Sequence, residues 1–384
     1  MKGANRSLSS LLFISSWILA SQTWAFTEMI RHGYSTCIAC HVSPSGGGAL
    51  TEYGREISGT ALSTWSYTDE QNYLHGALDP KKLPLWVSAL GGDVRILYNH
   101  VKAPSGNDNR WIEMQEDGEV GVKIKEVRIH AVAGRIVQNG ESYGDLRKYY
   151  ALVPFDEQHY LRVGKFQPEL GINIPEHISL VKEAIGAAPL NTAYSAEFSW
   201  ISPNWSYTVT GFIPTGDRWT DDSDTANADG VTVLKTRGVY QNLSYTFAKT
   251  YKIGVSQSVA SDIDNQTDVT TAGVFGALGF THKLYSLFEM DYLQNKFAGM
   301  KLEGVAAYVK LAYEIFRGFH VWGLYENSRP DWHHTDTEED DFGVGIQWFP
   351  RPHFDFQVKW TKILTHDVPN DWSDQGFLYL HYYL

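Results

Sequence analysis

The sequence predicts an all-β protein, an antiparallel barrel of about sixteen strands preceded by a short N-terminal segment of a different kind. Three observations support this prediction. Short runs of alternating apolar and polar residues continue from residue 84 to the end, separated alternately by turns of about two residues and longer polar connections. Aromatic residues make up 14% of the chain. No later stretch contains the ~18 apolar residues of a membrane-spanning helix.

Residues 1–25 have the pattern of a secretory signal peptide. Lys2 and Arg6 give a basic start, and the mostly apolar run from Leu8 to Ala20 is too short to span a bilayer. Ala25 is a small residue suited to cleavage. We therefore expect the chain to be exported.

The segment 26–83 contains both cysteines of the chain and shows little alternation. Leu50, Tyr53 and Ile57 have the spacing of one face of a short amphipathic helix, which Gly54 interrupts. We expect this segment to be one unit and residues 84–384 to be a second.

Residues 84–384 divide into about sixteen strands, with short turns such as Lys125-Glu126 and Arg317 on one side and long connections on the other. This asymmetry is typical of outer-membrane barrels, which have short periplasmic turns and long external loops. A soluble β-sandwich has the same alternation, but strands near the ~9–11 residues needed to cross a membrane favour a barrel in contact with outer-membrane lipid. The expected strand cores are 84–99, 110–123, 127–138, 146–155, 157–166, 194–202, 205–213, 231–247, 250–260, 271–281, 284–293, 302–315, 318–328, 341–349, 352–363 and 375–384.

The alternation also predicts which side chains face lipid. In the run 304–315, Val309 and Leu311 share one face, whereas Tyr308 and Lys310 lie on the other. Apolar residues outside and polar residues inside suit a barrel with lipid around it and water within.

The connection 168–193 is the third long one. Pro175-Glu176-His177 begins an expected helix, with proline in its first turn, and Val181 and Ile185 lie on its apolar face. An inward-folded loop that narrows the channel and an external helix that caps the barrel both remain open.

Cys37-Ile38-Ala39-Cys40-His41 is a CxxCH motif, the attachment signature of a c-type haem. Two thiols at this spacing can add to the two vinyl groups of one porphyrin, and the next residue places an imidazole on the iron. A thioredoxin-like pair would need a surrounding βαβ pattern, and a zinc site would need further ligands nearby. We predict one covalently attached haem c, with Cys37 and Cys40 as thioethers and His41 as proximal axial ligand.

The second axial ligand is less defined. His32 lies five residues before Cys37 and, at ~3.3 Å per residue, could just reach the far face of the haem. Met29, His75, a barrel residue such as His177 and an open sixth position are the alternatives.

A predicted external loop holds further candidate metal ligands. His333 and His334 precede a run of carboxylates, and imidazole with carboxylate can hold a divalent metal. A solvated acidic loop explains the same composition. The carboxylates are Asp336, Glu338, Glu339, Asp340 and Asp341.

The stretches His32–Cys37, His41–Gly48 and Leu50–Arg55 resemble the N-terminal haem segment of fused cytochrome–porins of the bacterial outer membrane. These are single chains with one c-type haem before a sixteen-stranded barrel, and their best-known members are outer-membrane iron-oxidising cytochromes. CxxCH and Tyr53-Gly54-Arg55 carry the resemblance at the residue level. The resemblance implies an outer-membrane haem protein and leaves its electron donor open.

Three functions follow as hypotheses. The first is electron transfer at or across the outer membrane, with a periplasmic or extracellular redox partner: a cytochrome, a shuttle or a metal ion. The second is a solute porin whose haem segment is a plug or redox-sensitive gate. The third is a haem enzyme such as a metal-ion oxidase, which needs an open sixth position. A formal net charge of -12 argues against nucleic acid as partner. Porins of this size are often trimers, so a homo-oligomer is compatible with the sequence.

Overall fold

The computed structural model describes residues 27–384 apart from 104–105, 139–140, 175–178, 188–191, 215–235, 263–266, 298, 335–337 and 367–370. The expected signal peptide and the expected helix start at Pro175–His177 lie outside the described residues. No helix in the described part is long and apolar enough to cross a membrane.

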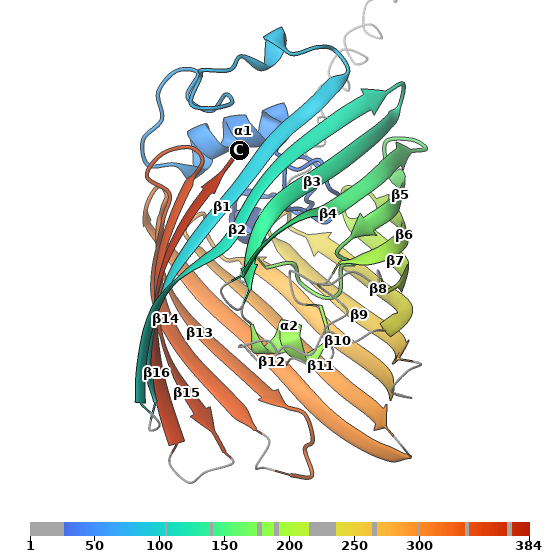
Figure 1. Ribbon diagram of the computed structural model, residues 1–384, viewed down its shortest axis with the longest axis vertical. Helices are drawn as coiled ribbons and strands as arrows, with labels where there is room; N and C mark the ends of the chain where they lie inside the picture. Colours follow the sequence, from blue (N-terminus) through green and yellow to red (C-terminus); the bar gives the residue numbers. More distant parts are fainter. Residues whose placement is uncertain are drawn as a thin grey trace, which may run out of the picture.

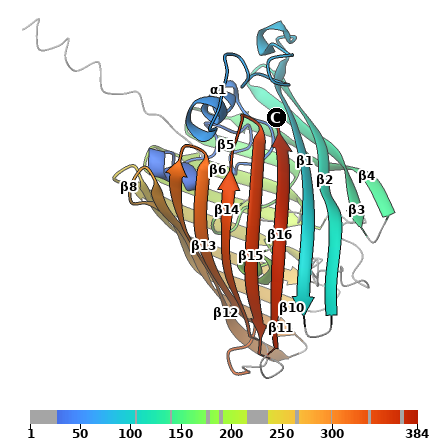
Figure 2. The ribbon, with the colours of Figure 1, turned by 90° about the vertical axis from the view of Figure 1, so that its left-hand side faces the viewer.

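The described residues form sixteen strands that close into one antiparallel barrel (Figures 1 and 2). Each strand pairs with its neighbours in sequence, and β1 pairs with β16 to close the wall. The strands are β1 Val87–Ala103, β2 Gly106–Ile124, β3 Val127–Gln138, β4 Glu141–Pro154, β5 His159–Phe166, β6 Ala193–Ile201, β7 Trp205–Ile213, β8 Thr236–Phe247, β9 Tyr251–Asp262, β10 Thr267–Gly279, β11 Leu284–Phe297, β12 Met300–Phe316, β13 Phe319–Arg329, β14 Glu339–Trp348, β15 Phe354–Thr365 and β16 Asp371–Tyr383.

The predicted strand order is confirmed. The connections at one end are all short, as predicted, but at the other end only those after β5, β7 and β13 are long, and those after β1, β3 and β11 have two residues. The strands differ from the prediction mainly at the long-loop end. The first strand was expected to end at residue 99, but β1 continues to Ala103, which pairs with Gly106 at the start of β2. Here the sheet extends through polar residues, whose sequence lacks the apolar alternation that marks a strand.

The two faces of the wall have the predicted chemistry. On β12, the side chains of Val309 and Leu311 are exposed on the outer face, whereas Tyr308 and Lys310 are buried inside. A closed wall with an apolar outer face is suited to lipid. The wall is therefore built to span a lipid bilayer.

The N-terminal segment lies at the short-turn end of the barrel, near the C-terminus (Figure 1). Backbone hydrogen bonds tie it to the β14–β15 turn, from Thr64 N to the Phe349 carbonyl (2.8 Å) and from Trp65 N to the Pro350 carbonyl (2.9 Å). The segment therefore packs on the barrel mouth and does not stand apart from it. Its helical elements are η1 Thr27–His32, α1 Glu52–Ile57, the π-helical turn η2 Ser58–Leu62 and η3 Pro80–Lys82.

The third long connection folds into the lumen, where its helix α2 (Leu180–Ala184) packs against β11, β12 and β13 (Figure 1). Val181 is fully buried, and Lys182 Nζ lies 2.7 Å from Glu289 Oε2 on the inner face of β11. The inward-folded alternative is therefore the correct one, and α2 does not cap the barrel from outside.

A charge on the outer face tests the position of the wall in lipid. We expect Val309→Arg, near the middle of β12, to destabilise the barrel by about 2–4 kcal/mol, because arginine is costly at the membrane midplane. Ile315→Arg, on the same face but beside a short turn, should cost about 0–1 kcal/mol. Denaturant unfolding in lipid vesicles measures both, and equal costs would contradict the orientation.

Candidate functional site

The CxxCH motif forms a single helical turn. The backbone N–H groups of Cys40 and His41 both donate to the Cys37 carbonyl, at 3.2 and 3.0 Å. Residues three apart on such a turn lie on the same side, so the two thiols are placed together and His41 follows them directly. Local geometry thus meets the requirement for attachment to one porphyrin.

Helix α1 packs directly on this turn. Thr51 caps the helix by accepting from Gly54 N, and it also binds the turn, with its N–H on the Cys40 carbonyl (2.9 Å) and its hydroxyl on the Ala39 carbonyl (2.7 Å). A Cβ on Gly54 would lie 2.2 Å from the Cys40 carbonyl oxygen. Only glycine fits where the helix and the turn meet.

Arg55 fixes the next layer. Its side chain is buried and donates to the Leu50 carbonyl (2.9 Å) and to the Tyr73 hydroxyl (2.8 Å), with the guanidinium 4.0 Å from the centre of the Tyr73 ring. The sequence indicated Gly54 and Arg55 only through the resemblance. In the structure, Gly54 lets α1 pack closely on the CxxCH turn, and Arg55 links α1 to Leu50 and Tyr73.

The loop after the motif docks on the barrel wall. Val42 N donates to the Ala49 carbonyl (3.1 Å) and closes the loop. Ala49 N then donates to Glu119 Oε2 on β2 (2.7 Å), and Arg162 Nη1 on β5 donates to Ser43 Oγ (2.8 Å). The wall of the barrel thus forms part of the surroundings of the motif.

A partly open pocket lies between this loop, the inner faces of β2 to β5 and the third long connection. Gly46 lines it and also contacts the motif, since a Cβ on Gly46 would lie 3.2 Å from Cys37 Sγ. Phe166 and Leu170 contribute apolar surface and Lys148 a positive charge. The lining also contains the carboxyl groups of Glu119 and Glu169, and it does not include Cys37, Cys40 or His41. The two thiols and the adjacent imidazole of the turn are the donors that a c-type haem uses.

The surroundings of the Cys37 thiol argue against thiol exchange. Burial, together with the negative charge of Glu169, raises the pKa of Cys37 to about 12, and the positive charges of Lys252 and Arg162 offset this only in part. Reactive disulfide-exchange cysteines have lowered pKa values. The thioredoxin-like alternative is therefore disfavoured.

His32, the candidate distal ligand, is held at the rim of the barrel. Its Nε2 accepts from Arg31 Nε (3.0 Å), and its ring stacks on His282 with centroids 5.7 Å apart. Burial, then the charges of Arg31 and His282, lower the pKa of His32 to about 4, so the ring is neutral at pH 7. Its recorded contacts in the described part of the chain do not include Cys37, Cys40 or His41, and its role as ligand stays a prediction.

The other candidate ligands are placed elsewhere. Met29 is buried in a cluster with Leu62 and Phe349, so its sulfur packs in a core. His75 stacks on Phe354 at the start of β15. His177 lies outside the described residues.

Arg31 is a residue that sequence reasoning missed. It is 1% exposed, and its Nη2 lies 3.2 Å from Glu314 Oε1 on β12 while Nη1 lies 3.4 Å from His320 Nδ1 on β13. A buried charge in the N-terminal segment is thus paired with a buried charge of the wall. No local sequence pattern signals this pair, which joins residues 283 positions apart.

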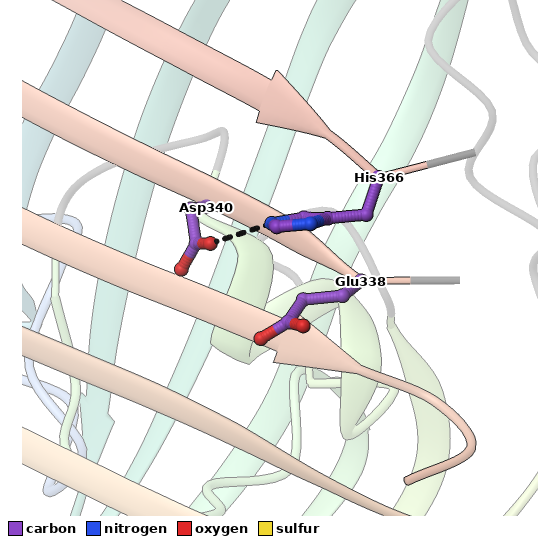
Figure 3. A group of neighbouring side chains, drawn as sticks. All are labelled: Glu338, Asp340 and His366. Carbon is purple, nitrogen blue, oxygen red and sulfur yellow. Dashed lines mark hydrogen bonds and ion pairs between the residues drawn. The ribbon is translucent and has the colours of Figure 1, made fainter. Parts of the chain in front are cut away.

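The external rim brings together Glu338, Asp340 and His366, whose candidate ligand atoms lie within 4.8 Å of one another (Figure 3). His366 Nε2 lies 3.0 Å from Asp340 Oδ2, and Glu338 is paired with Arg329. Hydrogen bonds and ion pairs thus account for the cluster without a cation.

The expected grouping of the acidic loop around His333 and His334 differs from this. His334 contacts Asp331, at 2.7 Å, and the carboxylates of residues 338 and 340 join His366 from the end of β15 instead. Asp336 lies outside the described residues.

No protein-family model and no curated protein matches the chain. Solved structures do, with TM-scores of 0.57. They include a loop-deletion mutant of OmpT, an outer-membrane protein of Vibrio cholerae, at 11% identity over 77% of this chain and 98% of that one. The outer-membrane channel DcaP of Acinetobacter baumannii matches at 13% identity over 77% and 96%. An anion-selective porin from Comamonas acidovorans matches at 9% over 77% and 98%. The chain shares the barrel fold of these outer-membrane proteins.

The contact of Gly54 with the CxxCH turn can be tested by Gly54→Ala. The added Cβ should overpack the contact and cost about 1–3 kcal/mol, loosening the N-terminal segment while the barrel stays folded. Limited proteolysis of the segment in folded protein measures this loosening. Glu52→Ala, on the exposed side of α1, is the control and should leave the cleavage rate unchanged. Equal cleavage of both variants would show that the close packing is not needed.

Proposed function

We propose that this chain is a porin-like outer-membrane barrel whose N-terminal segment occupies the periplasmic mouth, carries one covalent haem c and transfers electrons at the outer membrane. The observation that carries the proposal is the CxxCH turn, packed under α1 beside a cavity of the barrel interior. The short-turn end of such barrels faces the periplasm, so the segment lies on that side. When bound, a c-type haem supplies a one-electron carrier.

The roles of the chain's own residues follow from their positions. Cys37 and Cys40 would hold the group through thioethers, and His41 would be its proximal ligand. Arg162 positions the loop through Ser43, while Phe166 and Leu170 contribute apolar surface to the neighbouring pocket. Such a shell tunes the potential of a metal centre by limiting solvent access.

The electron partner follows from the same geometry. A periplasmic cytochrome or shuttle would meet the segment directly at the short-turn end. An extracellular donor, such as a metal ion, would have to reach the site through a lumen that crosses a layer of about 30 Å. The third connection and the N-terminal segment both fold into that lumen, so the periplasmic partner is the shorter route.

The second candidate function is a solute channel in which the segment is a plug or redox-sensitive gate. The comparisons favour this candidate, because DcaP is described as a channel and the Comamonas protein as an anion-selective porin. A lumen lined with buried charged residues agrees with it. One matching form of OmpT is a trimer, which supports a homo-oligomer for either function.

Covalent haem is tested by mass spectrometry of the full chain, produced in a host that matures c-type cytochromes. We expect the mass of one haem on each chain and its loss in the Cys37→Ser/Cys40→Ser variant, because both thioether bonds are then removed. The pyridine haemochrome spectrum is the second readout. A wild-type mass without haem would contradict the proposal, and the solute channel would then be the remaining candidate function.

Single-channel conductance separates the two functions. We expect low conductance from the wild type, since the segment is anchored in the lumen. Arg31→Ala should raise it, because leaving Glu314 buried without its partner costs about 3–5 kcal/mol. Arg317→Ala, which removes only exposed contacts to the segment, is the control. A high wild-type conductance, unchanged in Arg31→Ala, would favour an open solute porin.

The reduction potential should depend on pH through Glu169. Burial raises the pKa of this carboxyl to about 7, and its charge acts on Cys37. Deprotonation favours the oxidised, more positive iron, so the potential should fall as pH rises through 7, by less than about 59 mV per unit. Potentiometric titration should show a flatter profile in Glu169→Gln and a normal one in Glu157→Gln, which alters an exposed turn. A wild-type profile in Glu169→Gln would contradict this coupling.

A further inference from the structure

We propose that residues 64–75 of the N-terminal segment bind the phospholipid surface on the periplasmic side of the outer membrane, with Trp65 and Tyr67 extending the aromatic belt of the barrel. The inference concerns a surface that neither the haem site nor the channel uses. It therefore holds whether or not the chain carries a haem.

The aromatic belt lies on the outer face of the wall at its short-turn end. Phe319 of β13 lies opposite Trp348 of β14, which lies opposite Phe356 of β15, and residues directly opposite on antiparallel strands share a face. Val344, on the same face of β14 as Trp348, is exposed to the outside. Phe354 shares the face of Phe356, because side chains two apart on a strand point the same way. Aromatic residues in this position mark the interface between membrane and water.

The stretch 64–75 continues the belt beyond the ends of the strands (Figure 1). The Trp65 ring packs edge-on against Trp348, with ring centroids 5.6 Å apart, and Trp348 Nε1 donates to Thr64 Oγ1 (3.0 Å). At the other end of the stretch, His75 stacks on Phe354 with centroids 5.5 Å apart. Both contacts are with outward-facing rings of the wall. The stretch therefore runs along the outer edge of the mouth.

Large side chains of this stretch are left uncovered. Trp65 is 53% exposed, Tyr67 68% and Leu74 51%. Apolar area left in water costs about 25 cal/mol for each Å², and exposed apolar patches mark contact surfaces. Tryptophan and tyrosine suit the headgroup level of a membrane in particular, because each joins an apolar ring to a polar group.

Two arginines lie beside these rings. The Arg351 guanidinium lies 5.5 Å from the centre of the Tyr67 ring, and Arg317 Nη2 donates to the Thr64 carbonyl (3.0 Å). Both arginine residues are exposed, and positive charges at a membrane surface attract the phosphate groups of anionic lipids. Continuity with the lipid-facing wall decides the occupant. Lipid that covers Trp348 also meets the ring packed on it, so a phospholipid surface fits better than a protein partner.

Lipid binding would fasten the N-terminal segment from a second side. Arg31 pairs with Glu314 on the inner face of the wall, whereas Trp65 would hold a later part of the segment to the outside. Helix α1, which supports the CxxCH turn, is followed by η2 and then by this stretch. The membrane would thus help to hold the CxxCH turn at the mouth of the barrel.

Photocrosslinking of the full-length chain in vesicles of phosphatidylethanolamine and phosphatidylglycerol tests the proposal. Benzoylphenylalanine replaces Trp65 in one variant and Tyr67 in another, whose exposed side chain can be changed without disturbing the fold. We expect irradiation to add the mass of one phospholipid to both variants, as read by mass spectrometry. Val309→benzoylphenylalanine, on the outer face of β12, is the positive control. Glu52→benzoylphenylalanine, on the exposed side of α1, should give no lipid adduct.

The outcomes separate lipid from a protein partner. Absence of lipid adducts at both positions, while the Val309 variant forms one, would overturn the proposal. Adducts to a second protein in place of lipid, after irradiation of native outer membranes, would also overturn it and assign the stretch to a protein interface. Neither result depends on covalent haem, which the mass of the wild-type chain reports separately.

Discussion

Closure of the barrel by β1 and β16 is the constraint on which the rest of the structure depends. Their antiparallel pairing runs from Asp93 opposite Tyr383 to Lys102 opposite Asp374. An open edge in lipid would leave backbone groups without partners, at several kcal/mol each. The closed wall also separates its interior from lipid, so that charged side chains can lie inside. The third connection and the N-terminal segment can fold only because that interior exists.

Paired charges hold those two segments inside. Lys182 of the third connection pairs with Glu289, and Arg31 of the N-terminal segment pairs with Glu314. Taking such ions from water is costly, and removing one partner leaves a buried charge uncompensated. The main effect of these pairs is therefore to fix the position of each segment, and their contribution to the free energy of unfolding is small. A segment of fewer than sixty residues has little core of its own, and here it uses the wall of the barrel as its core.

Local features could be predicted from the sequence, and long-range ones could not. A period of two residues marks each strand, so the order and faces of the barrel followed from runs such as 304–315. CxxCH is read from five adjacent residues. The direction of the third connection could not be predicted, because the apolar face with Val181 would be buried in either alternative. His366 joins Asp340 only through strand register set over the whole wall. The role of Arg31 could not be predicted, because its partners are hundreds of residues away in the sequence.

Docking of the CxxCH segment inside the barrel is the central claim, and hydrogen–deuterium exchange of the folded full-length chain tests it most directly. The N–H groups of Val42, Ala49 and Thr51 donate to the Ala49 carbonyl, to Glu119 and to the Cys40 carbonyl. Amides held in this way exchange only when the structure opens. The account predicts that peptides covering residues 42–51 exchange as slowly as those of β2 and β3. Exchange as fast as that of the exposed short turns would contradict it.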